Sequence, residues 1–123
     1  GELRYHTLHA NTWVKQLGSA TEESTGRLQQ SIDQLMPYAL GIFEESPYEE
    51  ELIAQGIFAG EKELKAKWIE KIEAIIQQTN LHLPDWKLIK PMFGGRVGKH
   101  SDHLQPLLDE MSEVFRIDPS AEW

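Results

Sequence analysis

The chain has 123 residues, which is enough for one domain with one hydrophobic core. Its formal net charge of −8 argues against a duplex nucleic-acid binder, because that class needs a basic face, and the lack of cysteine excludes disulfides and thiolate chemistry. No apolar run reaches the roughly 18 to 20 residues of a membrane span and no signal peptide opens the chain, so we expect a cytoplasmic protein.

Apolar residues at helical spacing predict a first amphipathic helix over residues 3–17. Its stripe consists of Leu3, His6, Ala10, Trp13, Val14 and Leu17. Gly18 is expected to end the helix as the residue after its last turn. No capping residue precedes the pattern, so we expect the helix to begin upstream in a longer parent, of which this chain is a fragment.

A second helix is predicted to begin at Ser19-Ala20-Thr21-Glu22, which has the form of a capping box. Its apolar stripe consists of Leu28, Ile32, Leu35, Met36, Ala39, Leu40 and Phe43. Pro37 lies inside this stripe. Because proline removes a backbone hydrogen bond and clashes with the preceding turn, we expect a kink between Asp33 and Pro37.

Beyond Ser46-Pro47, residues 48–55 predict a short helix ended by Gly56, and residues 61–79 predict the third long helix. The stripe of the third helix consists of Leu64, Trp68, Ile72, Ile75 and Ile76. Residues 80–99 read as a long irregular connection, which is usually functional or mobile.

The last helix is predicted to be capped by Ser101 and to end at Asp118-Pro119, with an irregular first turn at Pro106. Its core face consists of Leu104, Leu107, Leu108, Met111, Val114 and Phe115. No segment alternates convincingly with period two. The pattern therefore predicts an all-α bundle of about four main helices in a single domain over residues 1–123.

Histidines near carboxylates are the first candidates for chemistry. Glu2 and His6 share a helix face, but di-iron bundles use Glu-x-x-His spacing, so a core or interface histidine is the simpler interpretation. His100 and His103 flank Asp102, and His103 lies seven residues before Glu110. These groups fit a metal pair, an acid/base pair or, more simply, surface histidines at a helix start.

A basic segment surrounds three glycines, Gly94, Gly95 and Gly98. From Trp86 to Ser101 there are four basic residues and no acidic one, whereas the rest of the chain has eight basic and twenty acidic residues. Two functional hypotheses follow: an anion site for the phosphates of coenzyme A, or a surface for an acidic partner. A solvated loop without a ligand is the third interpretation. The candidate residues are Lys87, Lys90, Arg96, Lys99 and His100.

Several strings together resemble one protein family. They are Arg4-Tyr5-His6-Thr7-Leu8-His9, Leu17-Gly18-Ser19-Ala20-Thr21-Glu22-Glu23-Ser24, Gly94-Gly95-Arg96-Val97-Gly98-Lys99-His100-Ser101-Asp102-His103-Leu104, Leu108-Asp109-Glu110-Met111 and Pro119-Ser120-Ala121-Glu122-Trp123. Their order and spacing resemble the PaaC subunits of bacterial phenylacetyl-CoA oxygenase (1,2-epoxidase). The likeness extends over the whole chain, as the C-terminal half of such a subunit.

This resemblance implies a ferritin-like fold and a non-catalytic structural role beside a PaaA subunit, which carries the di-iron site. In that family the complex inserts one oxygen atom into the aromatic ring of phenylacetyl-CoA, with electrons from NADPH through a reductase. PaaC-like subunits resemble di-iron proteins but have lost the ligand set. We therefore assign no catalytic residue, no metal ligand and no cofactor to this chain.

Two other functions remain as alternatives. One is a free-standing ferritin-like oxidase that binds metal through Glu2, His6, His103 and Glu110, and the other is a helical interaction module unrelated to this pathway. Trp86 and Trp123 lie outside the helical stripes and are interface candidates. In half a subunit the first two helices would lack covering helices, so we expect the isolated chain to form a symmetric dimer.

Overall fold

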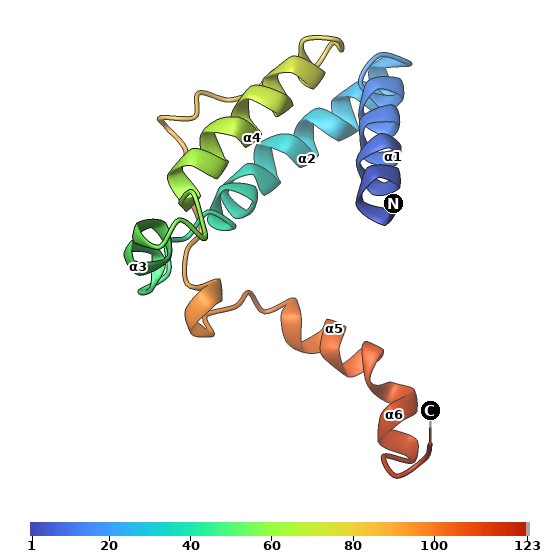
Figure 1. Cartoon of the computed structure of the whole chain (residues 1–123). Helices are drawn as coiled ribbons and strands as arrows, with labels where there is room; N and C mark the ends of the chain where they lie inside the picture. The colour runs from blue at the N-terminus through green and yellow to red at the C-terminus, as the bar shows by residue number, and fades with distance from the viewer. Residues whose placement is uncertain (123) are drawn as a thin grey trace. The chain divides into compact units, whose positions relative to one another are not determined.

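The computed structural model describes residues 1–122, which fall into two compact units, residues 1–93 and residues 94 onward. The first unit contains α1 (Glu2–Leu17), α2 (Glu22–Gly41), α3 (Glu49–Ala54) and α4 (Glu61–Ile76) (Figure 1). The second contains the short 3₁₀ helix η1 (Gly95–Val97), α5 (Leu104–Met111) and α6 (Glu113–Ile117). No strand occurs among the described residues, so the all-α prediction is confirmed.

The helix boundaries in the first half lie close to those predicted, but the capping box is formed by other residues. Thr21 is the N-cap of α2: its Oγ1 accepts from the amide of Ser24 at 3.0 Å, and its own amide donates to Ser24 Oγ at 3.1 Å. The expected box began at Ser19, two residues too early. Ser24 Oγ also donates to the carbonyl of Leu17 at 2.8 Å, so the same group links the end of α1 to the start of α2.

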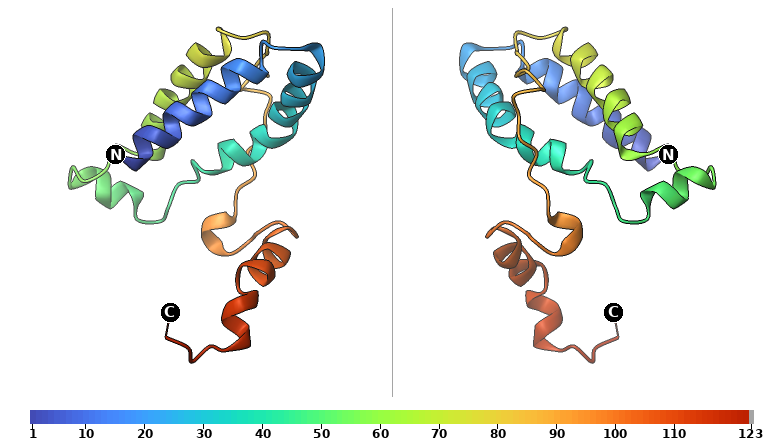
Figure 2. Two further views of the ribbon diagram at one scale, coloured as in Figure 1. Left: turned by 90° about the vertical axis from the view of Figure 1, so that its right-hand side faces the viewer. Right: turned by 90° about the vertical axis from the view of Figure 1, so that its left-hand side faces the viewer.

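In the first unit α1 packs against both α2 and α4, and the views in Figure 2 show α1 beside α4. Figure 2 also shows α2 bending part-way along, as Pro37 inside the helix leads one to expect. The apolar core of the described chain is small. It consists of Met36, Leu40, Ile76 and Leu81.

The third long helix is shorter than predicted, because α4 ends at Ile76 rather than Thr79. Thr79 forms two hydrogen bonds with the end of α4: its amide and its hydroxyl both donate to the carbonyl of Ile76, at 2.9 Å and 2.7 Å. Its Oγ1 then accepts from the amide of Leu81 at 3.1 Å. Hydroxyl side chains that bond nearby backbone groups in this way favour turns over helix.

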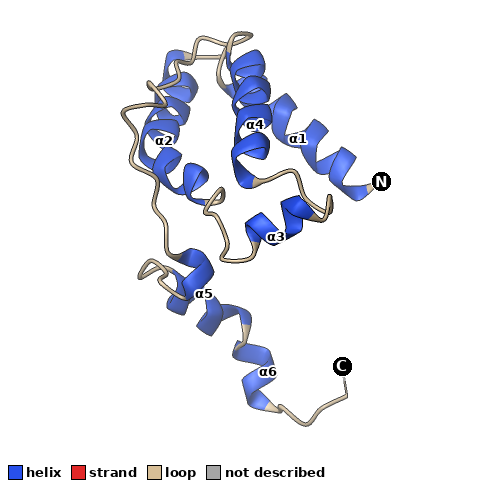
Figure 3. Ribbon diagram, turned by 60° about the vertical axis from the view of Figure 1, so that its left-hand side comes forward, coloured by secondary structure: helices blue, strands red, loops and turns tan. Residues whose placement is uncertain are grey.

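Residues 77–93, here called the return segment, connect α4 back along α2 and lie on that helix as a loop (Figure 3). Backbone hydrogen bonds fix both ends, from Asn80 to the Gly18 carbonyl and from Met92 to the Pro37 carbonyl, each 2.9 Å. In between, the Gln29 side chain bonds both backbone groups of His82. The first part of the connection predicted over residues 80–99 as long and irregular is therefore anchored at three places.

Trp86 adds a further contact between the return segment and α4. Its ring meets Trp68 edge-on with centroids 5.8 Å apart, and Trp68 in turn packs against Phe43 at 5.5 Å. Its indole Nε1 donates to Glu73 Oε1 at 2.8 Å. Trp86 is half-buried, and its role as an interface candidate stays a prediction, whereas Trp123, the other candidate, lies outside the described residues.

The short helix α3 confirms the prediction for residues 48–55 and also positions α4. Glu49 on α3 is buried, and its Oε1 accepts from the amide of Glu61, the first residue of α4, at 2.8 Å. A carboxylate at this place satisfies one of the amides that have no partner within the helix. Gly60, the residue before Glu61, has a φ of +97°, a backbone conformation that favours glycine.

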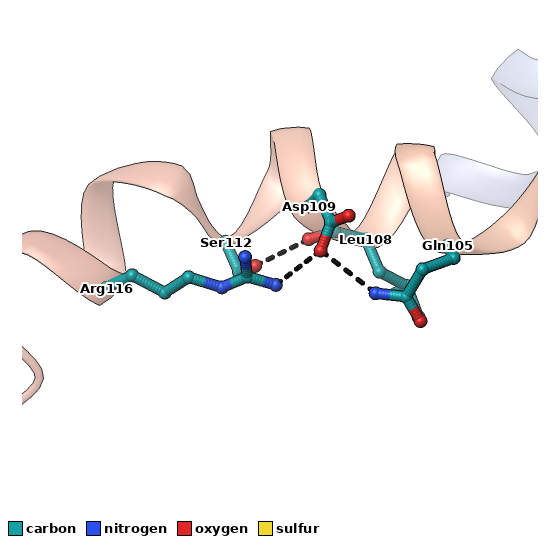
Figure 4. A network of polar contacts seen from close by, with 5 residues as sticks. All are labelled: Gln105, Leu108, Asp109, Ser112 and Arg116. Carbon is teal, nitrogen blue, oxygen red and sulfur yellow. Dashed lines mark hydrogen bonds and ion pairs between the residues drawn. The ribbon is translucent and has the colours of Figure 1, made fainter.

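The second unit departs most from prediction. Instead of one helix capped by Ser101, α5 begins after His103 with no side-chain cap, and the helix is interrupted at Ser112, whose Oγ donates to the Leu108 carbonyl. Such back-bonding bends helices. Asp109 of α5 joins the two parts, because its Oδ1 accepts from Arg116 of α6 at 2.6 Å; the same oxygen also accepts from Gln105 of α5 at 2.9 Å (Figure 4).

The apolar face predicted as the core of this last helix is not buried in the described structure. Leu104 is half-buried, while Leu107, Leu108, Met111, Val114 and Phe115 are exposed. A unit of this size is too small to build a core of its own, since below about 40 residues a chain buries too little surface.

Candidate functional site

An apolar cavity of about 340 Å³ lies between α1, α2 and α4, and we call it the groove. Its lining consists of Ala10, Asn11, Val14, Leu28, Ser31, Ile32, Leu35, Met36, Ala39, Trp68, Ile72, Ile75, Ile76 and Leu83. No charged side chain contributes to this lining. Most of these residues belong to the three apolar stripes predicted for the long helices. The stripes therefore face one another as expected, but they surround a cavity.

The apolar stripes are only partly covered. No residue of α1 is buried, and Leu35 of α2 lines the groove while the residue remains 59% exposed. Val14 and Ile32, which also line the groove, are half-buried. A large apolar surface of this kind marks a site where another polypeptide or ligand binds.

A row of three aromatic rings lies on α1, and only one of them, Trp13, belongs to the predicted apolar stripe. Tyr5 and His9 stack with centroids 6.0 Å apart, and His9 meets Trp13 edge-on at 6.1 Å. All three side chains are exposed. The spacing of four residues between successive rings is the signal that the sequence carried, since residues four apart share a helix face.

The residues of the predicted anion site are divided between the two units. Lys87 and Lys90 lie on the return segment of the first unit, whereas Arg96, Lys99 and His100 belong to the second. All five side chains are exposed. The structure therefore supplies exposed cationic groups in each unit, and the single anion site predicted from these residues stays a prediction.

The glycines of this segment close a turn. Gly94 and Gly98 have φ of +118° and +81°, and the Gly94 carbonyl accepts from the amides of Val97 at 3.0 Å and Lys99 at 2.9 Å. These two amides are occupied within the turn. Binding of an anion by the side chains of Arg96 and Lys99 stays a prediction.

The candidate metal ligands do not assemble into a site within either unit. Glu2 and His6 are exposed on α1, and His6 faces the ring of Tyr5 edge-on at 6.1 Å instead of lying in a core. In the second unit His100, Asp102, His103 and Glu110 are also exposed. Across residues 1–122 no group of three or more histidine, aspartate or glutamate side chains is placed to hold a metal ion.

None of the helices in residues 1–122 combines the length and apolarity needed to cross a membrane.

Comparison with known proteins gives two consistent matches. The family model described as phenylacetic acid catabolic protein matches residues 1–123. The chain is also 30% identical over 122 residues to the C subunit of the 1,2-phenylacetyl-CoA epoxidase of Escherichia coli (strain K12). That match covers 99% of this chain and 48% of the relative, so the chain spans about half the length of the relative.

Proposed function

This chain belongs to the phenylacetic acid catabolic protein family, as a PaaC-type chain with a ferritin-like helical fold, and from that premise we propose its function. We propose that it forms part of a non-catalytic structural subunit of a multicomponent phenylacetyl-CoA epoxidase. In this role it supports a separate PaaA-type subunit, which carries the di-iron site. The reaction would use phenylacetyl-CoA as substrate and NADPH as the source of electrons, through a reductase.

The match to a PaaC-type relative over almost the whole chain is the observation that carries this proposal. A di-iron centre in a helical bundle needs several carboxylates and two histidines, with Glu-x-x-His spacing on two helices. The residues described here do not fit that requirement, because Glu2 and His6 are four apart and no third donor joins them. The donor set thus favours a structural role over a catalytic one.

The alternative is a free-standing ferritin-like oxidase that binds its own metal. Its candidate ligands are Glu2, His6, His103 and Glu110, and the exposure of all four favours the structural role. Ligands of a catalytic metal usually lie inside the bundle, oriented by further hydrogen bonds.

Co-purification with the candidate di-iron subunit from the same source separates the two functions. We expect the two polypeptides to elute together and iron to be found only in the partner. Stoichiometric iron in this chain, with no complex formed, would contradict the structural role and favour the oxidase. A variant with Glu2→Gln and His6→Gln serves as the control: it should leave both assembly and iron content unchanged.

A further inference from the structure

A second cavity, of about 570 Å³, lies between the end of α4 and the return segment, and we call it the polar cavity. Unlike the groove, it has several polar side chains in its lining, which are those of Glu73, Gln77, Thr79 and His82. Half-buried apolar side chains, Leu83 and Pro84, lie beside them. A cavity of this volume has room for a small ligand. Its mixed lining favours a ligand that has both a polar group and an apolar part.

Glu73 supplies the one carboxylate of the polar cavity, and no lysine or arginine contributes to the lining. Its Oε1 accepts from Trp86 Nε1 at 2.8 Å, whereas no described residue donates to its Oε2. Among residues 1–122 no basic side chain forms an ion pair with Glu73. A half-buried carboxylate that lines a cavity and lacks a cationic partner favours a cation that donates hydrogen bonds.

Trp86 is the second feature that favours a cation. Its ring lines the same cavity. Two contacts hold this ring in place, the hydrogen bond to Glu73 and the edge-on contact with Trp68 at 5.8 Å. The face of a tryptophan ring attracts cations electrostatically. The carboxylate of α4 and the indole of the return segment therefore lie together, and a neutral or anionic ligand would gain from neither.

We propose that the polar cavity binds an organic cation with a short apolar stem, of the alkylguanidinium type. The guanidinium donates to Glu73 Oε2 and stacks on Trp86, and the stem lies against Leu83 and Pro84. A guanidinium suits this place better than an ammonium, because it is planar, donates in a fixed geometry and stacks on aromatic rings. Two sources carry this chemistry, a free small molecule and an arginine side chain of another polypeptide segment.

NMR titration of the 123-residue chain with n-butylguanidinium chloride tests the proposal at constant ionic strength. The indole Nε1–H of Trp86 donates to Glu73, so its resonance reports directly on that carboxylate. The variant Trp86→Phe assigns the resonance. We expect it to shift in a saturable way. The neutral n-butylurea has almost the same shape as n-butylguanidinium and should produce no such shift.

A second ligand separates the two sources. N-acetylarginine amide carries the same guanidinium on a peptide backbone. Binding at least as tight as that of n-butylguanidinium would support the proposal with an arginine side chain as the source. Binding of n-butylguanidinium with exclusion of N-acetylarginine amide would support it with a free small molecule as the source.

Glu73→Gln removes the negative charge but keeps a side-chain oxygen that can accept from Trp86. It should weaken binding of n-butylguanidinium about 10-fold or more, because a hydrogen bond to a charged group is lost. Glu70→Gln is the matched control, since Glu70 is an exposed carboxylate of the same helix that lies outside the lining of the polar cavity. This control should leave the affinity unchanged.

A second variant keeps the result interpretable if Glu73→Gln loses helix content by circular dichroism. Gln77 is exposed and lies four residues after Glu73, so Gln77→Lys supplies a cation to the same carboxylate from within the chain. It should also weaken binding. The proposal is overturned if n-butylguanidinium gives no saturable shift up to about 100 mM. An equal shift with n-butylurea, or full affinity in both cavity variants, would overturn it as well.

Discussion

Gln29 of α2 and His82 of the return segment are joined by two hydrogen bonds, although 53 positions separate them in sequence. Gln29 Nε2 donates to the carbonyl of His82 at 2.9 Å, and Gln29 Oε1 accepts from the amide of His82 at 2.8 Å. The Gln29 side chain thereby satisfies the backbone amide and carbonyl of His82, which no helix or strand partner satisfies in this irregular segment. The contact holds the return segment against α2.

Replacing Gln29 by Leu should therefore release the middle of the return segment. Both backbone groups of His82 would lose their partners, and we expect a loss of about 1 to 3 kcal/mol in unfolding free energy. The amide of His82 should exchange with solvent much faster, as measured by hydrogen-exchange NMR. Gln30→Leu at the exposed neighbouring position is the control. Equal protection of His82 in both variants would contradict the anchoring role.

Gly41 and Gly26 lie in the same helix but should respond in opposite ways to alanine. A Cβ at Gly41 would overlap the carbonyl oxygen of Met92, which is backbone and cannot yield easily. We expect Gly41→Ala to cost about 2 to 3 kcal/mol. At Gly26 nothing lies within 4 Å, so Gly26→Ala should stabilise the helix by about 0.5 to 1 kcal/mol. Urea unfolding of both variants checks the pair, and a stable Gly41→Ala variant would show that the return segment does not contact α2 there.

These contacts explain what the sequence could predict and what it could not. The stripes of the three long helices follow from a period of 3.6, which depends only on neighbours along the chain. The contact of Gln29 with His82 depends on which distant segment returns to α2, and no local pattern carries that information. Gly18 illustrates the same limit: it does end α1, but with φ −73°, and its lack of a side chain serves the close approach of Leu81 rather than a left-handed turn.

The candidate site was predictable to a similar extent. The strings that resemble the PaaC family pointed to the correct family, since the family model matches residues 1–123 and the C-subunit relative is 30% identical over 122 residues. Most apolar residues of the groove were visible as helix stripes, but the sequence placed them in a core because a stripe does not reveal whether anything covers it. The interruption at Ser112 was missed for a related reason, because the apolar spacing continues through the break.

Asp109 gives a prediction about pH. Hydrogen bonds from Arg116 and then Gln105 hold the pKa of Asp109 below its ordinary value. A carboxyl whose pKa is lower in the folded state stabilises the fold above its unfolded pKa, and this contribution is lost as the pH falls through the folded pKa. Arg116→Gln should raise the pKa of Asp109 toward its ordinary value, as followed by NMR titration of the carboxyl carbon.

Gln105→Ala should raise the same pKa by less, because its hydrogen bond is the smaller of the two causes. The control is Lys62→Gln, which removes a positive charge in the first unit. An Asp109 pKa that does not move in Arg116→Gln would show that the two helices are not joined by this pair in solution.

The basic residues of the second unit test whether the predicted anion site exists. Arg96 and Lys99 are exposed around the closed Gly94 turn, so replacing both by Glu reverses charge without removing buried side chains. We expect coenzyme A to bind about 10-fold more weakly or worse, and the loss to be greater at low salt because the contacts are electrostatic. Titration calorimetry with coenzyme A measures this affinity. The control is the double variant Lys15→Glu with Lys71→Glu, which carries the same charge change on other exposed positions.

If coenzyme A binding is unchanged while assembly with the di-iron subunit is lost, Arg96 and Lys99 contact an acidic partner surface. If neither changes, the segment is a solvated loop and its charge has no ligand.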